Sequence, residues 1–170
     1  MNDYSMLKKL HNGILRNMAS IYLRKGDQIL LLYRQGDSIV SKMWIGSAGG
    51  HFEMNEVNDA QACVLREMQE ELGLTRDRIQ SFSLRYITLR YTNDEIRQNY
   101  YFFADLIGDD KSDLVSTEGI TRWYSINNLA ELTMPFTARH MINHYLTIGQ
   151  FDDSLYGGLA NNDRVIFEKL

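Results

Sequence analysis

The segment from Arg66 to Leu74 places three carboxylates within one short stretch of chain. In a helix, residues three and four apart share a face, so Glu67, Glu70 and Glu71 would form one acidic stripe. Carboxylates at this spacing repel one another, and the side chain of Arg66 projects toward a neighbouring face. A hard divalent cation, which prefers oxygen ligands, would relieve the repulsion. The pattern predicts a helix with a metal-binding side, and a solvated acidic surface is the alternative.

The residues around this stripe predict where the helix begins, ends and packs. Asn58-Asp59 offers an N-cap and Gly73 is a C-terminal signal, so we expect a helix over about residues 59–72. Beside the carboxylates runs a stripe of apolar residues, which are Val64, Leu65, Met68 and Leu72. The helix can therefore pack on a sheet with its apolar stripe while its acidic side lines a cleft.

A loop of small residues precedes the helix. Residues 46–53 read Gly-Ser-Ala-Gly-Gly-His-Phe-Glu, and glycine lets the backbone approach a ligand closely. A glycine loop, a helix cap and a carboxylate stripe then follow one another in the order that a phosphate-and-metal site requires. This combination predicts phosphate chemistry more strongly than the acidic stripe does alone.

Together these residues resemble the signature of the Nudix hydrolases. That signature is a Gly, five residues, a Glu, seven residues, then Arg-Glu, an apolar residue, any residue, Glu-Glu, any residue, Gly and an apolar residue. The matching positions are Gly50, Glu56, Arg66, Glu67, Met68, Glu70, Glu71, Gly73 and Leu74. The chain departs from the pattern because nine residues separate Glu56 from Arg66, with the extra pair near Val57-Asn58 in the loop before the cap. Because the extra pair lies before the helix, it affects the expected role of Glu56 more than the roles of the helix glutamates.

The resemblance implies a fold and a chemistry. The fold is α/β, a Nudix-type α/β/α sandwich with a mixed β-sheet. The chemistry is hydrolysis of a nucleoside diphosphate linked to another moiety, with Mg²⁺ or Mn²⁺ as cofactor. Glu67, Glu70 and Glu71 resemble the metal ligands, and Gly49 resembles the residue whose backbone carbonyl reaches the cation.

The same resemblance suggests catalytic roles. Arg66 resembles the residue that orients the carboxylate of Glu67. The general base varies within the family between a helix glutamate, such as Glu70, and an acidic residue on a later loop. Glu118, just before Gly119, is the main candidate for an additional ligand or base on such a loop, and Glu95 is a weaker one.

Substrate contacts are predicted less sharply. Residues in or near the glycine loop are the first candidates: Arg34, Trp44, Gly50, His51 and Glu53. Aromatic rings stack on bases and arginine binds phosphate, which adds Tyr33, Arg85, Tyr91 and Arg97 by position. Most aromatic residues have an alternative role in sheet packing. The sequence does not choose among oxidised deoxynucleoside triphosphates, ordinary nucleotides, nucleotide sugars and dinucleotides.

Length and composition predict one domain over residues 1–170. The net charge of −4 argues against a nucleic-acid-binding surface, and no apolar run approaches the ~20 residues of a membrane helix. A single cysteine and an N-terminus without a secretory pattern favour the cytoplasm. We expect a small nucleotide-type substrate as partner, and both a monomer and a homodimer are compatible with the sequence.

Periodicity gives the remaining elements. Apolar residues at helical intervals predict a helix over residues 4–15, in an N-terminal extension over about 1–17. Strands are predicted near residues 18–24, 28–34, 43–45, 83–91, 97–106 and 120–125, and a second helix from Pro135 to about 147. A C-terminal tail over about 150–170 would close as a hairpin or a strand.

Two other functions stay open. A Nudix-fold isomerase of isoprenyl diphosphates would use a reactive cysteine in its pocket, whereas Cys63 lies inside the motif helix. A nucleotide-sensing module without catalysis would usually lose part of the glutamate set, and this chain keeps all of it.

Overall fold

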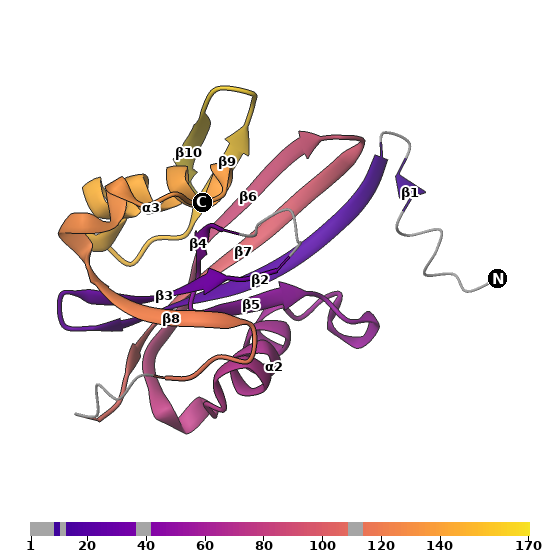
Figure 1. Cartoon of the computed structure of the whole chain (residues 1–170). Coiled ribbons are helices and arrows are strands. Elements are labelled where there is room, and N and C mark those ends of the chain that lie inside the picture. The colour runs from indigo at the N-terminus through magenta and orange to yellow at the C-terminus, as the bar shows by residue number, and fades with distance from the viewer. Residues whose placement is uncertain (1–8, 11–12, 37–41, 109–113) are drawn as a thin grey trace.

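A mixed β-sheet with a helix on each face organises the chain (Figure 1). The structure, a computed structural model, describes residues 9–10, 13–36, 42–108 and 114–170. Its strands are β1 (Lys9–Leu10), β2 (Gly13–Lys25), β3 (Gln28–Arg34), β4 (Trp44–Ile45), β5 (Ala48–His51), β6 (Ile79–Thr92), β7 (Glu95–Leu106), β8 (Gly119–Ser125), β9 (Tyr156–Ala160) and β10 (Val165–Lys169). Its α-helices are α2 (Ala60–Leu72) and α3 (Phe136–Thr147). Short 3-10 helices lie at Met54–Glu56 (η1), Arg76–Arg78 (η2), Ile126–Glu131 (η3) and Gly149–Phe151 (η4).

The strands follow the order β10-β9-β6-β7-β2-β3-β4, while β1 and β5 also pair with β2 and β8 pairs with β3. β2 runs parallel to β7, and β6 runs parallel to β9. The other pairings are antiparallel, so the sheet is mixed as predicted. Through its pairing with β2, β5 brings the glycine loop close to the centre of the sheet.

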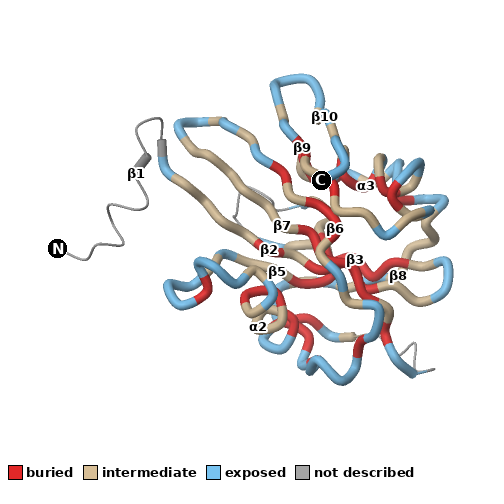
Figure 2. Tube along the Cα trace, turned by 180° about the vertical axis from the view of Figure 1, so that it is seen from behind, coloured by how far each residue is buried: buried red, intermediate tan, exposed pale blue. Residues whose placement is uncertain are grey.

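Alternation along β2 divides the apolar interior into two cores. Ile21 and Leu23 are fully buried on the α2 side, against Val64 and Met68. Tyr22, between them in sequence, is buried on the other side with residues of α3. Successive strand side chains point to opposite faces, so this pattern requires a covering helix on each face. The buried segments in Figure 2 accordingly lie along the central strands and the inner sides of the helices.

The helix predicted over residues 59–72 is confirmed as α2 and has the expected ends. Asp59 is the N-cap, and its carboxylate accepts a hydrogen bond from the backbone N–H of Ala62 at 2.9 Å. Gly73 adopts a left-handed conformation with φ of 66°, which glycine reaches without strain. Its N–H donates to the carbonyl of Gln69, which satisfies one of the last helix acceptors. The cap and the terminating glycine thus fix where the acidic stripe begins and ends.

The secondary structure predicted for the two ends of the chain agrees with the structure at the C-terminal end but not at the N-terminal end. The N-terminal helix is wrong for the residues that the structure describes, since residues 9–10 and 13–17 are strand and the rest of that segment lies outside them. From Ile14 onward β2 pairs with β7, and this pairing decides the conformation over the local periodicity. The tail forms the predicted hairpin, β9–β10. Among the described residues, no helix has the length and apolar character needed to cross a membrane.

Candidate active site

The acidic side of α2 lies directly against the glycine loop. The N–H of Gly49 donates a hydrogen bond to Oε2 of Glu71 at 3.1 Å. At the next residue, a Cβ added to Gly50 would overlap the carboxylate of Glu67. The absence of a side chain at Gly50 therefore lets the Glu67 carboxylate lie this close to the loop. The structure brings together the loop and the helix glutamates that the sequence singled out.

Arg66 organises the acidic stripe. Its Nη1 lies 2.8 Å from Oε1 of Glu67 and 3.0 Å from Oε2 of Glu70. Its Nη2 donates to the backbone carbonyl of His51 at 3.2 Å, so the same guanidinium also ties α2 to the end of β5. Hydrogen bonds to Glu56 and Glu67 raise the pKa of Arg66, which stays charged at any working pH. This contact supports an orienting role of Arg66 toward Glu67.

Glu56 is the strongest partner of Arg66 despite the longer spacing of the motif. Its side chain is 4% exposed, and its Oε1 lies 2.7 Å from Nε of Arg66. Its other oxygen accepts a hydrogen bond from the N–H of Glu53 at 2.8 Å, which caps η1. Bonding to Arg66 lowers the pKa of Glu56. Despite the two extra residues, Glu56 therefore remains close enough to α2 to form an ion pair with Arg66 and to hold its side chain in place.

Burial controls the protonation of the two inner glutamates. Burial raises the pKa of Glu71 to about 7, and the charges of Glu67 and Glu118 add to the rise. The hydrogen bond from the N–H of Gly49 and the charge of Arg34 oppose it. Burial also raises the pKa of Glu67, against the hydrogen bond from Arg66. The site therefore contains more negative charge than its own arginines neutralise.

This donor set fits a hard divalent cation. It offers carboxylate oxygens on neighbouring helical positions and a backbone glycine, which are ligands that Mg²⁺ accepts. Within the described ranges, no three acidic, histidine or cysteine side chains already converge as a cage. Instead, Arg66 Nη1 lies between Glu67 and Glu70, and Glu71 bonds to Gly49. The buried carboxylate of Glu71, whose pKa burial raises to about 7, is the observation that favours a cation here, because a cation would stabilise its charged form.

Glu118 reaches the site through the loop before β8. The N–H of Thr117 donates to the carbonyl of Glu71 at 3.1 Å, which fastens this loop to the end of α2. Glu118 forms an ion pair with Arg34, Nη2 to Oε2, at 3.1 Å. Two residues predicted for different roles, a base and a substrate contact, therefore lie together beside Glu71.

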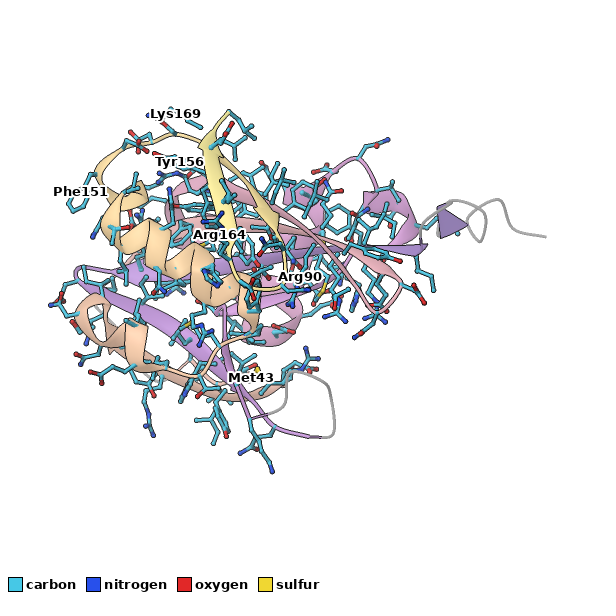
Figure 3. All side chains as sticks on the ribbon, turned by 90° about the horizontal axis from the view of Figure 1, so that it is seen from above. Met43, Arg90, Phe151, Tyr156, Arg164 and Lys169 are labelled. Carbon is cyan, nitrogen blue, oxygen red and sulfur yellow. The ribbon has the colours of Figure 1, made fainter. Side chains whose placement is uncertain are left out.

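A cavity of about 280 Å³ opens on the opposite face of the sheet, beneath the first turn of α3. Its floor comes from alternating residues of β2 and β7, namely Met18, Ser20, Tyr22, Arg97, Asn99 and Tyr101. Arg34, Gly49, Arg90 and Phe136 also line it. Figure 3 labels two lining residues, Met43 and Arg90, near the same end of α3. Gly49 therefore belongs both to the cavity and to the carboxylate cluster.

Two predicted substrate contacts lie elsewhere. Trp44 packs between Tyr33 and Tyr124, with ring centroids 5.0 and 4.9 Å apart, and does not line the cavity. Glu53 is the N-cap of η1 and is largely exposed, 4.0 Å from Nε of Arg66. Of the other predicted contacts, Arg34 lines the cavity and Gly50 packs against Glu67. The backbone carbonyl of His51 accepts a hydrogen bond from Arg66.

Two substrate contacts proposed by position, and the weaker candidate for the base, have structural roles. Arg85 is buried and donates to the carbonyls of Gly149, Asp152 and Ser154, so it anchors the segment before β9. Tyr91 is exposed and donates to Asp94 at the β6–β7 turn. Glu95 pairs with Arg16 and Arg97 instead of joining the helix glutamates.

The cavity also contains residues that the sequence did not single out, chiefly Arg90, Asn99 and Phe136. One signal for them was available. Asn93 and Asp94 form a two-residue hairpin turn, both with positive φ, and this turn type fixes strand register. Counting back from it places Arg90 directly opposite Arg97, as the structure has it. The approach of α3 to this pair had no comparable local signal.

Known structures resemble this chain over most of its length. A MutT protein from Bacillus halodurans is 21% identical with a TM-score of 0.64, covering 91% of this chain and 97% of its own. A MutT protein from Methanosarcina mazei Go1 is 19% identical with a TM-score of 0.65, covering 85% and 100%. The E. coli ORF135 protein is 18% identical with a TM-score of 0.63, covering 83% and 95%. At these identities the likeness concerns the fold, and among curated proteins none matches the chain in sequence.

A family model supplies the classification. The model described as the NUDIX domain matches residues 15–145, which include α2, most of α3, the glycine loop and the cavity-lining strands. The fold and the signature residues agree with this match, including Glu56 and Arg66 across the longer spacing. The chain therefore belongs to the Nudix family.

Proposed function

We propose that this protein hydrolyses a pyrophosphate bond in a nucleoside diphosphate derivative, with Mg²⁺ or Mn²⁺ as cofactor. The observation that carries the proposal is the double role of Gly49. Its N–H bonds to Glu71 of the acidic cluster, and the same residue lines the cavity. A substrate lying in the cavity would therefore present its phosphates where the carboxylates are gathered.

The residues of the chain have distinct tasks in this reaction. Glu67, Glu70 and Glu71 would hold the cation, and Arg66 would set the position of Glu67 through its 2.8 Å contact. When bound, the divalent cation supplies positive charge that neutralises phosphate oxygens. Arg34, at the mouth of the cavity beside Glu118, would contact the same phosphates.

The bond changes follow from hydrolysis of an anhydride. The oxygen of a water molecule forms a bond to one phosphorus, and the bond from that phosphorus to the bridging oxygen breaks. The bridging oxygen leaves with the other phosphate as an anion. The proton of the water passes to a carboxylate, and Glu118 is the proposed acceptor because it lies beside Glu71 on an exposed loop.

The other two functions have less support. An isomerase would need a reactive cysteine, but Cys63 is fully buried, and burial raises the pKa of its thiol to about 12. A sensing module is favoured by no feature of the site. The substrate we propose is a small molecule, and the cytoplasm stays the predicted compartment.

The test compares glutamate variants on a nucleotide panel with Mg²⁺ or Mn²⁺, read out as phosphate or pyrophosphate release. Glu70→Gln and Glu71→Gln should each lower turnover by at least about 100-fold, since each removes one negative ligand. Glu131→Gln, on exposed η3, is the matched control and should leave turnover unchanged. Tight nucleotide binding without release from any substrate would favour the sensing module and contradict the proposal.

A further inference from the structure

Three arginines form one row across the cavity face of the sheet. Arg97 of β7 lies directly opposite Arg90 of β6 and directly opposite Arg16 of β2. Residues opposite each other on neighbouring strands share a face, and like charges in that position destabilise a sheet. The arrangement needs a source of negative charge to offset the repulsion.

The described part of the chain supplies only part of that charge. Glu95 lies 2.9 Å from both Arg16 and Arg97. For Arg90, no carboxylate of the described residues lies within the 4.0 Å of an ion pair; its guanidinium stacks on the ring of Phe136 instead, 4.2 Å from the centroid. Burial and the charges of Arg139 and Arg90 lower the pKa of His140, which packs on the same ring. This corner of a protein of net charge −4 is therefore locally cationic.

The row closes the end of the cavity that is remote from the carboxylates. Arg90 and Arg97 line the cavity, and among the residues that the structure describes its lining includes no aspartate or glutamate. Ser20 of β2 pairs with Gly49 at the catalytic end, whereas Arg16 pairs with Arg97 at the other end. Four residues of strand separate these positions, or about 13 Å. The guanidinium of Arg97 pairs with Glu95, which lies still farther from Gly49 along β7, so the side chain does not shorten this distance. One diphosphate group at Gly49 therefore does not reach the arginines as well.

The surface between the two ends suits a flat, partly polar group. Met18 and Tyr101 supply apolar floor, Asn99 offers a side-chain amide, and Phe136 adds an aromatic ring on which Arg90 stacks. A nucleoside has this combination of a flat base and hydrogen-bonding groups. Arginine binds phosphate through paired N–H donors, so a second phosphate beyond the nucleoside would neutralise the row.

We infer that the cavity binds a nucleotide moiety bearing its own phosphoryl group in addition to the diphosphate that is cleaved, and that Arg90 and Arg97 bind that group. The inference rests on the proposed function for the position of the diphosphate at Gly49. It narrows the substrate class to nucleoside diphosphate derivatives that are phosphorylated a second time, on the sugar.

Binding without hydrolysis tests this inference separately from the proposed function. Titration calorimetry with EDTA present would compare 5′-monophosphates of adenosine, guanosine, cytidine and uridine with their 2′,5′- and 3′,5′-bisphosphates. For at least one nucleoside the wild type should prefer a bisphosphate by about tenfold or more, as charge-assisted bonds allow. Arg90→Gln and Arg97→Gln should reduce that ratio toward one, and Arg90→Lys should leave it in between.

Two controls keep the result interpretable. Arg78→Gln changes an exposed arginine of η2 outside the cavity and should keep the wild-type ratio, which accounts for simple charge attraction. Arg97→Gln also loses its ion pair with Glu95, so circular dichroism must show that it is folded, and Arg90→Gln carries the test if it is not. Equal affinity within every pair, absence of binding, or a preference that survives in both glutamine variants overturns the inference. Loss of the preference in either variant supports it, whatever the hydrolysis assay gives.

Discussion

The two faces of the sheet hold positive and negative charge in different ways. On the α2 face, carboxylates outnumber the arginine that joins them, and all of these groups come from residues 49–71. On the α3 face, arginines outnumber the carboxylate that joins them, and they come from β2 and from the β6–β7 hairpin, which are far apart in sequence. The acidic face is suited to a cation and the basic face to an anion. Gly49 is where the two meet.

This difference predicts that the faces affect different kinetic quantities. Under the proposed function, changes on the α2 face should act on turnover, because its groups would surround the reacting phosphates. Changes on the α3 face should act on substrate binding, because its groups would contact the part of the substrate that does not react. A variant that reverses either pattern would break the comparison.

Among the variants that test this comparison, the largest effect is expected for Gly50→Ala. The new methyl group would overlap the end of the Glu67 side chain, which can swing away, so the fold should survive while the carboxylate moves. A displacement of about 1 Å in a catalytic group can lower turnover by about 100-fold. Turnover and the midpoint of thermal unfolding, measured on the same variant, check this.

The neighbouring glycine provides the contrast. In Gly49→Ala the added Cβ would lie 2.7 Å from the backbone Cα of Ser20, which cannot move aside alone. That variant should lose stability as well as turnover. Near-normal turnover in Gly50→Ala would show that the position of the Glu67 carboxylate is not needed for the reaction.

The next effect concerns the support of Arg66. Glu56→Gln removes a buried charge that holds Nε of Arg66 at 2.7 Å, so the free energy of unfolding should fall by about 2 kcal/mol at pH 7. The pKa of Glu56 is lowered in the folded state from 4.5, so its contribution is present above that value and is lost as the pH falls. Urea denaturation at pH 7 and pH 4 should show the difference between wild type and variant narrowing.

Glu53→Gln is the matched control for this variant. Glu53 also faces Arg66, but at 4.0 Å and with a 60% exposed side chain, so its loss should change stability by less than about 0.5 kcal/mol. Equal effects of the two substitutions would mean that the buried pair does not support the helix.

The contrast between the two faces also explains which parts of the structure could be predicted from the sequence. The α2 face was predictable because its residues are local: a cap at Asp59, a stop at Gly73, and glutamates at helical spacing. The antiparallel β6–β7 hairpin was predictable from its β-rich runs and short turn. What a motif encodes within one short segment can be predicted without tertiary information.

The α3 face was not predictable to the same degree. Arg16 and Arg97 meet only because β2 and β7 pair in parallel, a long-range register that local periodicity does not carry. That pairing also places Ile14 and Leu15, the last residues of the expected N-terminal helix, in a strand. Likewise Trp44 looked available for a ligand, but two aromatic neighbours from other strands enclose it.

A third prediction concerns protons and cations at Glu71. Burial raises its folded pKa to about 7 from 4.5, so its contribution to the stability of the metal-free protein is complete below about pH 4.5 and is lost as the pH rises through 7. A cation that binds the carboxylate should replace the lost proton. Mg²⁺ should therefore raise the unfolding midpoint more at pH 8 than at pH 5.5.

Glu71→Gln isolates this effect from other titrating groups. Its unfolding midpoint should depend less on pH between 5.5 and 8 than that of the wild type, and Mg²⁺ should stabilise it less. Thermal unfolding with EDTA or Mg²⁺ at both pH values measures the difference. If Mg²⁺ stabilises the variant as much as the wild type, Glu71 is not a ligand.

The smallest effect is expected on the α3 face, for Phe136→Leu. Leucine keeps the apolar contact but removes the ring that holds Arg90 at 4.2 Å, an interaction worth a fewfold change in affinity. Once a substrate is known, KM should rise about threefold and kcat should stay the same. Phe151→Leu, at an exposed ring outside the cavity, should change neither constant. A fall in kcat as large as that of Gly50→Ala would mean that both faces position the reacting phosphates, and the division of labour between them would be wrong.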